Sequence, residues 1–155
     1  MDKKYFIIIS FGCFALGCIS GYFLFSPVVQ YIVPDGYGLA SMEPGDWVIT
    51  RMKFLLLWGF LFALFSVVNA SLKAERRRGV LMGLSGIMGA LLCAVYVKHQ
   101  LRWITQELQD ITYPYGSAIS IQALRLPWIP LSGILAVLLM FVVLKKFSKC
   151  VNTES

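Results

Sequence analysis

The residues best suited to redox or metal chemistry are few and far apart along this chain. It contains four cysteines and one histidine, namely Cys13, Cys18, Cys93, Cys150 and His99. No two cysteines form a Cys-x-x-Cys pair, whereas zinc and bis-histidine haem sites need several such ligands together. The sequence therefore predicts no metal ion and no cofactor. We expect the cysteines to serve as small apolar side chains.

One stretch resembles the nucleophile region of a known enzyme family. Residues 41–48 read Ser-Met-Glu-Pro-Gly-Asp-Trp-Val, and Lys53 follows. This order is similar to that around the catalytic serine of signal peptidases, which pair the serine with a lysine base. The usual spacer between the proline and Gly-Asp is missing here, and no soluble β-domain follows. Ser-Lys chemistry needs a desolvated lysine held beside the serine, but Lys53 stands where a helix enters the membrane. We therefore expect a turn-rich loop and no enzyme.

The segment around Cys18 resembles a bacterial lipoprotein processing site, in which the cysteine is lipidated after cleavage. Residues 14–18 read Phe-Ala-Leu-Gly-Cys, with Ala15 where leucine is usual. The residues after Cys18 stay apolar through Phe25, whereas a lipoprotein usually turns polar there. We expect an uncleaved membrane anchor, with lipidation at Cys18 as the alternative.

The composition of the chain is that of a membrane protein. Of the 155 residues, 58% are hydrophobic and 14% are charged, and the mean hydropathy is +0.73. A soluble domain has roughly 25% charged residues, and one this small cannot bury so much apolar surface. The pI near 9.3 suits a nucleic-acid binder, but the apolar bulk leaves no soluble basic face. The expected partner is therefore a lipid bilayer and not nucleic acid.

Four uncharged runs are long enough to cross a bilayer as helices, because a span takes about 20 apolar residues. They cover about residues 5–26, 54–72, 79–97 and 127–144. Ser26-Pro27 is expected to end the first helix, since the residue before proline avoids the α region. The sequence thus predicts an all-α membrane protein with a single domain, 1–155, of four transmembrane helices. No Asp, Glu, Lys, Arg or His interrupts these spans, which argues against proton-coupled transport and voltage sensing.

The distribution of basic residues predicts the orientation of the chain. Nine Lys and Arg residues lie in the two terminal segments and the link 73–78, and five lie in segments 27–53 and 98–125. Because cytoplasmic loops are enriched in Lys and Arg, we expect both termini in the cytoplasm and two longer outer loops. The net charge of +6 then lies on the cytoplasmic side, facing anionic lipids. We expect a multi-pass protein of a cell membrane, in particular a bacterial inner membrane.

Small residues at helical spacing predict how the spans pack, because membrane helices associate through close contact. Two stripes of this kind occur in the first and third spans: Cys13, Gly17 and Gly21, then Gly79, Gly83, Gly86, Ala90 and Ala94. We expect them to face other helices of the same chain, with a partner protein or a second copy as the alternative. The second span is aromatic and is expected to fill against the stripe of the third. The short link 73–78 predicts that these two spans form a tight hairpin.

The third span continues into an amphipathic pattern. Leu101, Ile104, Leu108 and Ile111 recur at helical spacing, and Tyr113-Pro114 ends the pattern. A helix from 79 to 111 would be about 50 Å long, so it either projects from the membrane or bends along the interface. We favour the interface, where Trp and Tyr are enriched, with a docking face for a partner helix as the alternative.

These features favour a non-enzymatic membrane protein that acts through protein–protein interaction, including immunity or phage superinfection exclusion. Proteins that protect bacteria against pore-forming colicins are similar in architecture, although no motif joins this chain to them. The alternatives are an accessory or assembly subunit of a larger membrane complex and, third, a transporter or channel for a neutral or lipidic substrate. For the protective role, the expected contact residues are Asp35, Glu43, Asp46, Trp47, Arg102, Trp103 and Glu107.

Overall fold

The protein is built from four long helices. The computed structural model describes residues 3–33, 38–39, 44–71, 76–109, 118–119 and 121–151. The helices are α1 (Lys3–Ile32), α2 (Pro44–Ser71), α3 (Arg76–Gln109) and α4 (Trp128–Val151). Each helix carries a stretch that is long and apolar enough to cross a membrane. The chain is therefore an all-helical, multi-pass membrane protein.

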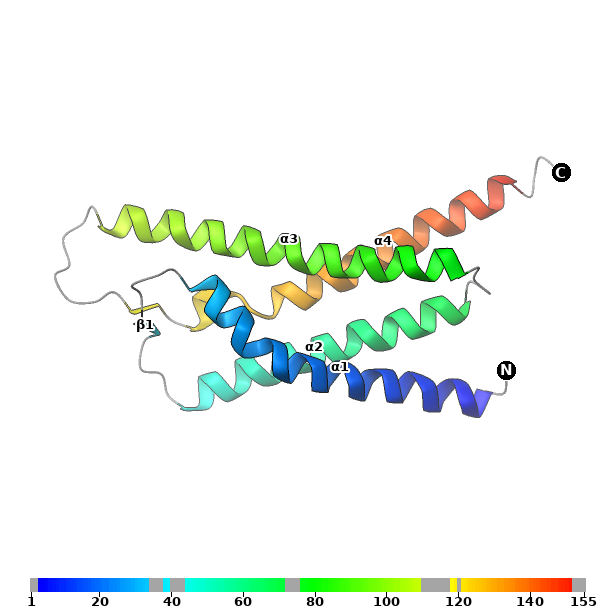
Figure 1. Cartoon of the computed structure of the whole chain (residues 1–155), viewed down its shortest axis with the longest axis horizontal. Helices are drawn as coiled ribbons and strands as arrows, with labels where there is room; N and C mark the ends of the chain where they lie inside the picture. The colour runs from blue at the N-terminus through cyan, green and yellow to red at the C-terminus, as the bar shows by residue number, and fades with distance from the viewer. Residues whose placement is uncertain are drawn as a thin grey trace.

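The helices run antiparallel, so both ends of the chain lie at the same end of the bundle, which we call the terminal end (Figure 1). The opposite end, where α1 and α3 finish and α2 and α4 begin, is the loop end. Helix α1 packs mainly along α2, and α3 packs mainly along α4. The α2–α3 contact is much smaller, although the short link predicts a tight hairpin there. The helices pair where small residues allow their backbones to approach closely. The length of the link between two helices does not determine the pairing.

Helix α1 continues through Pro27 to Ile32, so the prediction that it ends at Ser26-Pro27 is wrong. A proline inside a helix removes one hydrogen bond and bends the chain, and the last turns of α1 change direction toward α3 (Figure 1). Phe25, Val29 and Ile32 are buried along this part of α1. Their burial offsets the lost hydrogen bond.

Helix α2 starts at Pro44, about ten residues before the predicted span. Proline is favoured in the first turn of a helix because its missing N–H would have no partner there. Asp46 adds a negative charge near the helix N-terminus, where the helix dipole stabilises it. Glu43-Pro44-Gly45-Asp46, predicted to be a turn, therefore leads into a helix at Pro44.

Helix α3 is one continuous rod through the predicted span and its extension (Figure 1). Its 34 residues span about 51 Å, which exceeds the roughly 30 Å of a bilayer core. It does not bend to lie along an interface. Leu101 and Thr105 are buried, while Trp103 and Ile104 are exposed. The extension thus packs one face on the chain itself.

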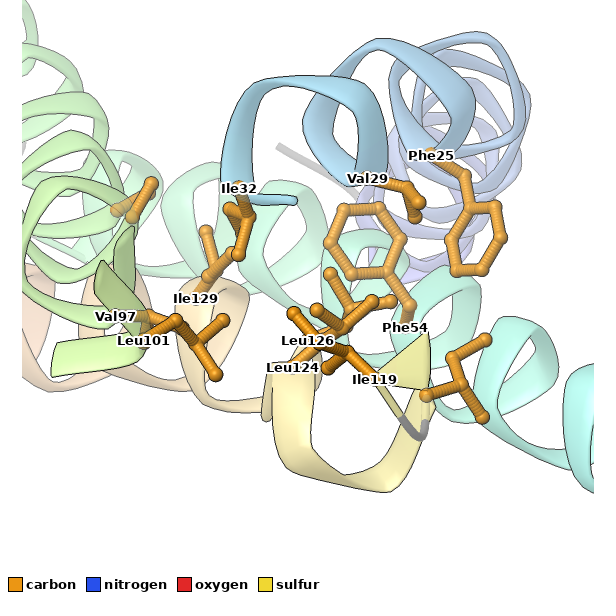
Figure 2. Close-up of a cluster of buried hydrophobic side chains, with 13 residues drawn as sticks. Phe25, Val29, Ile32, Phe54, Val97, Leu101, Ile119, Leu124, Leu126 and Ile129 are labelled. Atoms are coloured by element: carbon orange, nitrogen blue, oxygen red, sulfur yellow. The ribbon is translucent and has the colours of Figure 1, made fainter. Parts of the chain in front are cut away.

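The best-packed core lies at the loop end. There the ends of α1 and α3 meet α2, the first turn of α4 and the 3-10 helix η1 (Ile121–Leu124). Figure 2 shows Phe25, Phe54, Leu101, Leu124 and Ile129 converging in this cluster. Strands β1 (Gly38–Leu39) and β2 (Ala118–Ile119) form one short parallel pair beside it. This core holds the loop end of all four helices together.

Candidate functional site

Helices α1 and α2 cross at a point where glycines allow their backbones to approach closely. A Cβ atom added to Gly17 would lie 2.8 Å from the Cα of Gly59 and 3.0 Å from the carbonyl oxygen of Trp58. One added to Gly21 would lie 3.1 Å from the Trp58 Cβ. The Cys18 side chain packs against Gly59, and its Sγ would lie 2.6 Å from a Cβ added to that glycine. Backbones this close leave no room for a larger side chain at Gly17.

The pair α3–α4 crosses in the same way. A Cβ on Gly89 would lie 2.8 Å from the Ala136 Cβ and 2.9 Å from the Ser132 carbonyl oxygen. One on Gly133 would lie 2.9 Å from the Gly86 carbonyl oxygen. The Ser132 hydroxyl is shared between the Ile129 carbonyl of its own helix, at 2.7 Å, and the Gly89 carbonyl of α3, at 3.0 Å. Within the stripe of the third span, Gly79 and Gly83 face Asn69 and Phe65 of α2, whereas Gly86 lies between Leu61 of α2 and Val137 of α4.

Between these two helix pairs lies a cleft of about 510 Å³, which we call the inter-pair cleft. All four helices line it, from the middle of the bundle toward the loop end. Its lining residues are Ser20, Leu24 and Val28 of α1, Trp58, Leu61, Phe62 and Phe65 of α2, Gly83, Gly86, Ile87, Ala90, Leu91 and Ala94 of α3, and Ile129 and Val137 of α4. Leu24, Phe62, Ile87 and Leu91 are also exposed at the surface. The cleft therefore opens sideways between α3 and the pair α1–α2, toward the surface that a bilayer would cover.

The lining carries almost no polar group. Ser20 and Trp58 are its only residues with a polar side-chain atom, and they satisfy each other, because the Trp58 Nε1–H donates to the Ser20 Oγ at 3.0 Å. The Ser20 hydroxyl in turn donates to the Gly17 carbonyl at 2.9 Å. No polar atom of the lining is left to recognise a polar ligand. The cleft is suited to hydrocarbon.

The two ends of the cleft differ in chemistry. Toward the terminal end, Asn69 lies against Gly79, with its Oδ1 2.6 Å from where a Cβ would be, which brings α2 and α3 together. Toward the loop end, the Lys98 ammonium lies 3.8 Å from the centre of the Tyr31 ring. This contact joins α3 to α1 beyond the opening. A positive charge therefore marks one end of an otherwise apolar cleft.

Replacing Ser20 with alanine should destabilise the α1–α2 pair by about 1 kcal/mol, because it leaves the half-buried Trp58 N–H without its acceptor. Unfolding in mixed detergent micelles measures this change. Ser26→Ala, at an exposed position of the same helix, is the matched control and should have little effect. Equal losses in both variants would mean that the hydrogen bond does not hold the wall of the cleft.

Of the predicted partner-contact residues, the structure describes the side chains of Asp46 and Trp47 at the start of α2 and of Arg102 and Trp103 near the end of α3. Trp47 is half-buried and stacks edge-on against Phe25, with ring centres 5.2 Å apart. Asp46 accepts a long hydrogen bond from Gln122, at 3.5 Å. Arg102 and Trp103 are exposed on α3. Asp35 and Glu43 lie outside the described residues, as does the side chain of Glu107.

The structure also places the residues considered for chemistry. Cys13 and Cys18 are half-buried within α1, and the Cys18 thiol is 3.6 Å from the Leu55 carbonyl oxygen. Lys53 is exposed on α2, and Ser41 lies outside the described residues. Among the described side chains, no three His, Cys, Asp or Glu residues gather as metal ligands would.

No protein-family model matches the chain, and neither a curated protein nor a solved structure shows significant similarity to it. The site is therefore interpreted from its own geometry.

Several residues of the site were not predicted from the sequence. Gly59, Gly89 and Gly133 form the helix crossings, and Lys98 marks the end of the cleft. Gly89 follows Gly86 by three residues, which is the helical spacing of the stripe in the third span, so it could have been included there. Lys98 is four residues after Ala94 and seven after Leu91, which places it on the cleft-lining face.

Proposed function

We propose that this protein is a non-enzymatic membrane protein that binds a hydrophobic chain inside the bilayer, and that the inter-pair cleft is the binding site. The observation that carries the proposal is a cleft of about 510 Å³ with an apolar lining in the middle of the bundle. Ligand sites of small molecules commonly have volumes of this order. Helices in membranes associate through close contact, so an unfilled space of this size would weaken the bundle.

The length and lining of the cleft suit an extended hydrocarbon chain. Gly83 and Ala94 mark its length on α3, and they are about 16 Å apart along the axis. The two polar side chains of the lining are hydrogen-bonded to each other, so the occupant that we propose is a hydrocarbon chain lying along this length.

Filling the cleft from within tests this function. Ala94→Phe places a ring in the cleft and should reduce the hydrophobic molecule retained after purification in mild detergent at least tenfold. Native mass spectrometry of the intact protein measures the retained molecule. Leu139→Phe, at an exposed position of α4, is the control and should retain the molecule like the wild type. Equal retention in both variants would contradict the proposal.

A second candidate function is the protein–protein interaction expected from the sequence, in the form of immunity, superinfection exclusion or membership of a larger complex. The observation that favours it is the long α3, which carries exposed Arg102 and Trp103 beyond the cleft. Aromatic residues and arginine are enriched at protein interfaces. Cross-linking from position 103 in native membranes tests it: a discrete protein adduct would support this function, and adducts with lipid alone would contradict it.

A further inference from the structure

We propose that the hydrophobic chain in the inter-pair cleft belongs to an anionic lipid of the surrounding bilayer, whose head group binds at Lys98. This inference rests on the proposed function and specifies its ligand. The juxtaposition that supports it is a positive charge at one end of a cleft that otherwise accepts only hydrocarbon.

The geometry of α3 brings the charge to the cleft. Leu91 and Ala94 line the cleft, and Lys98 follows them by seven and four residues, so its side chain leaves the helix on the same face. On α1, Tyr31 follows the lining residue Val28 by three residues. The contact of 3.8 Å between the Lys98 ammonium and the Tyr31 ring therefore lies in line with the opening.

The depth of Lys98 fits a lipid head group. It is the first charged residue after the uncharged run 79–97 of α3, and lysines at this position extend toward the membrane surface. A chain lying along the opening would bring its polar group to this level. Arg102, one turn further along α3, is exposed and adds positive potential beyond the head-group position.

The surroundings of Lys98 favour a lipid head group by its charge and not by its pattern of hydrogen-bonding groups. A tyrosine ring attracts the ammonium through its negative face, so the ring orients Lys98 without neutralising it. Lys98 is half-buried, and its charge is less screened than that of an exposed lysine. An anionic head group would gain this interaction, and a zwitterionic one would gain much less.

The test compares two lipids on the purified full chain. Phosphatidylglycerol and phosphatidylcholine with identical acyl chains are added in equal amounts, and native mass spectrometry gives the ratio bound. One lysine near a membrane surface corresponds to about a fivefold preference for the anionic lipid. We expect this preference in the wild type and in Lys98→Arg, and its loss in Lys98→Gln. The matched control is Lys53→Gln, at an exposed lysine of α2 near the loop end, and it should keep the preference.

The possible results separate the two proposals. Should Lys98→Gln keep the preference, or Lys53→Gln lose it equally, head-group binding at Lys98 is wrong. A third result is that Ala94→Phe reduces the binding of both lipids and Lys98→Gln changes neither. The cleft would then remain the binding site, and only its selection of an anionic head group would be overturned. Binding that is unchanged in Ala94→Phe would overturn the cleft itself, and with it this inference.

Discussion

Leucine in place of Gly17 should separate α1 from α2 and lower the free energy of unfolding by about 3 kcal/mol. Even a single Cβ at this position would lie within 2.8 Å of the Gly59 Cα and 3.0 Å of the Trp58 carbonyl oxygen. Both of these atoms belong to the backbone of α2, so no side-chain rotation relieves the overlap. The helices must move apart, and the contacts of Gly21 with Trp58 are lost with them. Unfolding by detergent titration measures the effect.

The control is Gly12→Leu on the same helix. Nothing lies within 4 Å of a Cβ added to Gly12, and leucine favours a helix over glycine by nearly 1 kcal/mol. This variant should be as stable as the wild type or slightly more stable. A similar loss in both variants would show that leucine itself perturbs α1 and that the crossing at Gly17 does not determine stability.

Gly89→Leu should have a comparable effect on the pair α3–α4. An added Cβ would approach the Ser132 carbonyl oxygen to 2.9 Å, and the Ser132 hydroxyl, which donates to the Gly89 carbonyl, would be displaced. We expect a loss of about 3 kcal/mol or failure to accumulate in membranes. Expression level and unfolding of the purified variant both report on this change.

Gly83→Leu provides the comparison within α3. The stripe of small residues in the third span predicts that leucine at Gly83 or at Gly86 disrupts the fold. In the structure, a Cβ on Gly83 meets only the Phe65 ring, at 3.3 Å, whereas one on Gly86 lies 2.8 Å from Val137 Cγ2. Gly83 also lines the inter-pair cleft, so leucine there can extend into the open space. Gly83→Leu should therefore destabilise the protein less than Gly89→Leu. An equal loss of stability in these two variants would contradict this packing.

The existence of the four helices could be predicted from the sequence, but their bounds could not. Uncharged runs of about 20 residues are sufficient to identify spans, and four such helices are found. Pro27 is a local signal for a helix end, yet burial of Phe25 and Ile32 keeps α1 helical beyond it. Pro44 is a turn signal in isolation and a favoured first-turn residue once a helix follows.

The small-residue stripes indicate which helix faces pack closely, but not which helices they meet. Gly86 and Gly89 could face α2 or α4 on sequence evidence, and the aromatic α2 was the expected neighbour. The backbones of α3 and α4 approach because Gly133 stands opposite them. The cleft has no sequence pattern of its own, because it is the space left where the pairs α1–α2 and α3–α4 do not touch. Its lining residues come from all four helices.

Contacts between lipid and protein protons reveal whether a hydrocarbon chain occupies the inter-pair cleft. The methyl groups of Ala90 and Ala94 line the cleft, and these residues are only 4% and 8% exposed, so bulk lipid outside the bundle contacts them little. With methyl-labelled protein in deuterated detergent and protonated phosphatidylglycerol, NMR should show cross-relaxation from acyl-chain methylenes to both methyl groups, and its loss on removal of the lipid. Cross-relaxation from the lipid to exposed methyl groups such as those of Leu139, with none to Ala90 or Ala94, would contradict the proposed occupancy of the cleft.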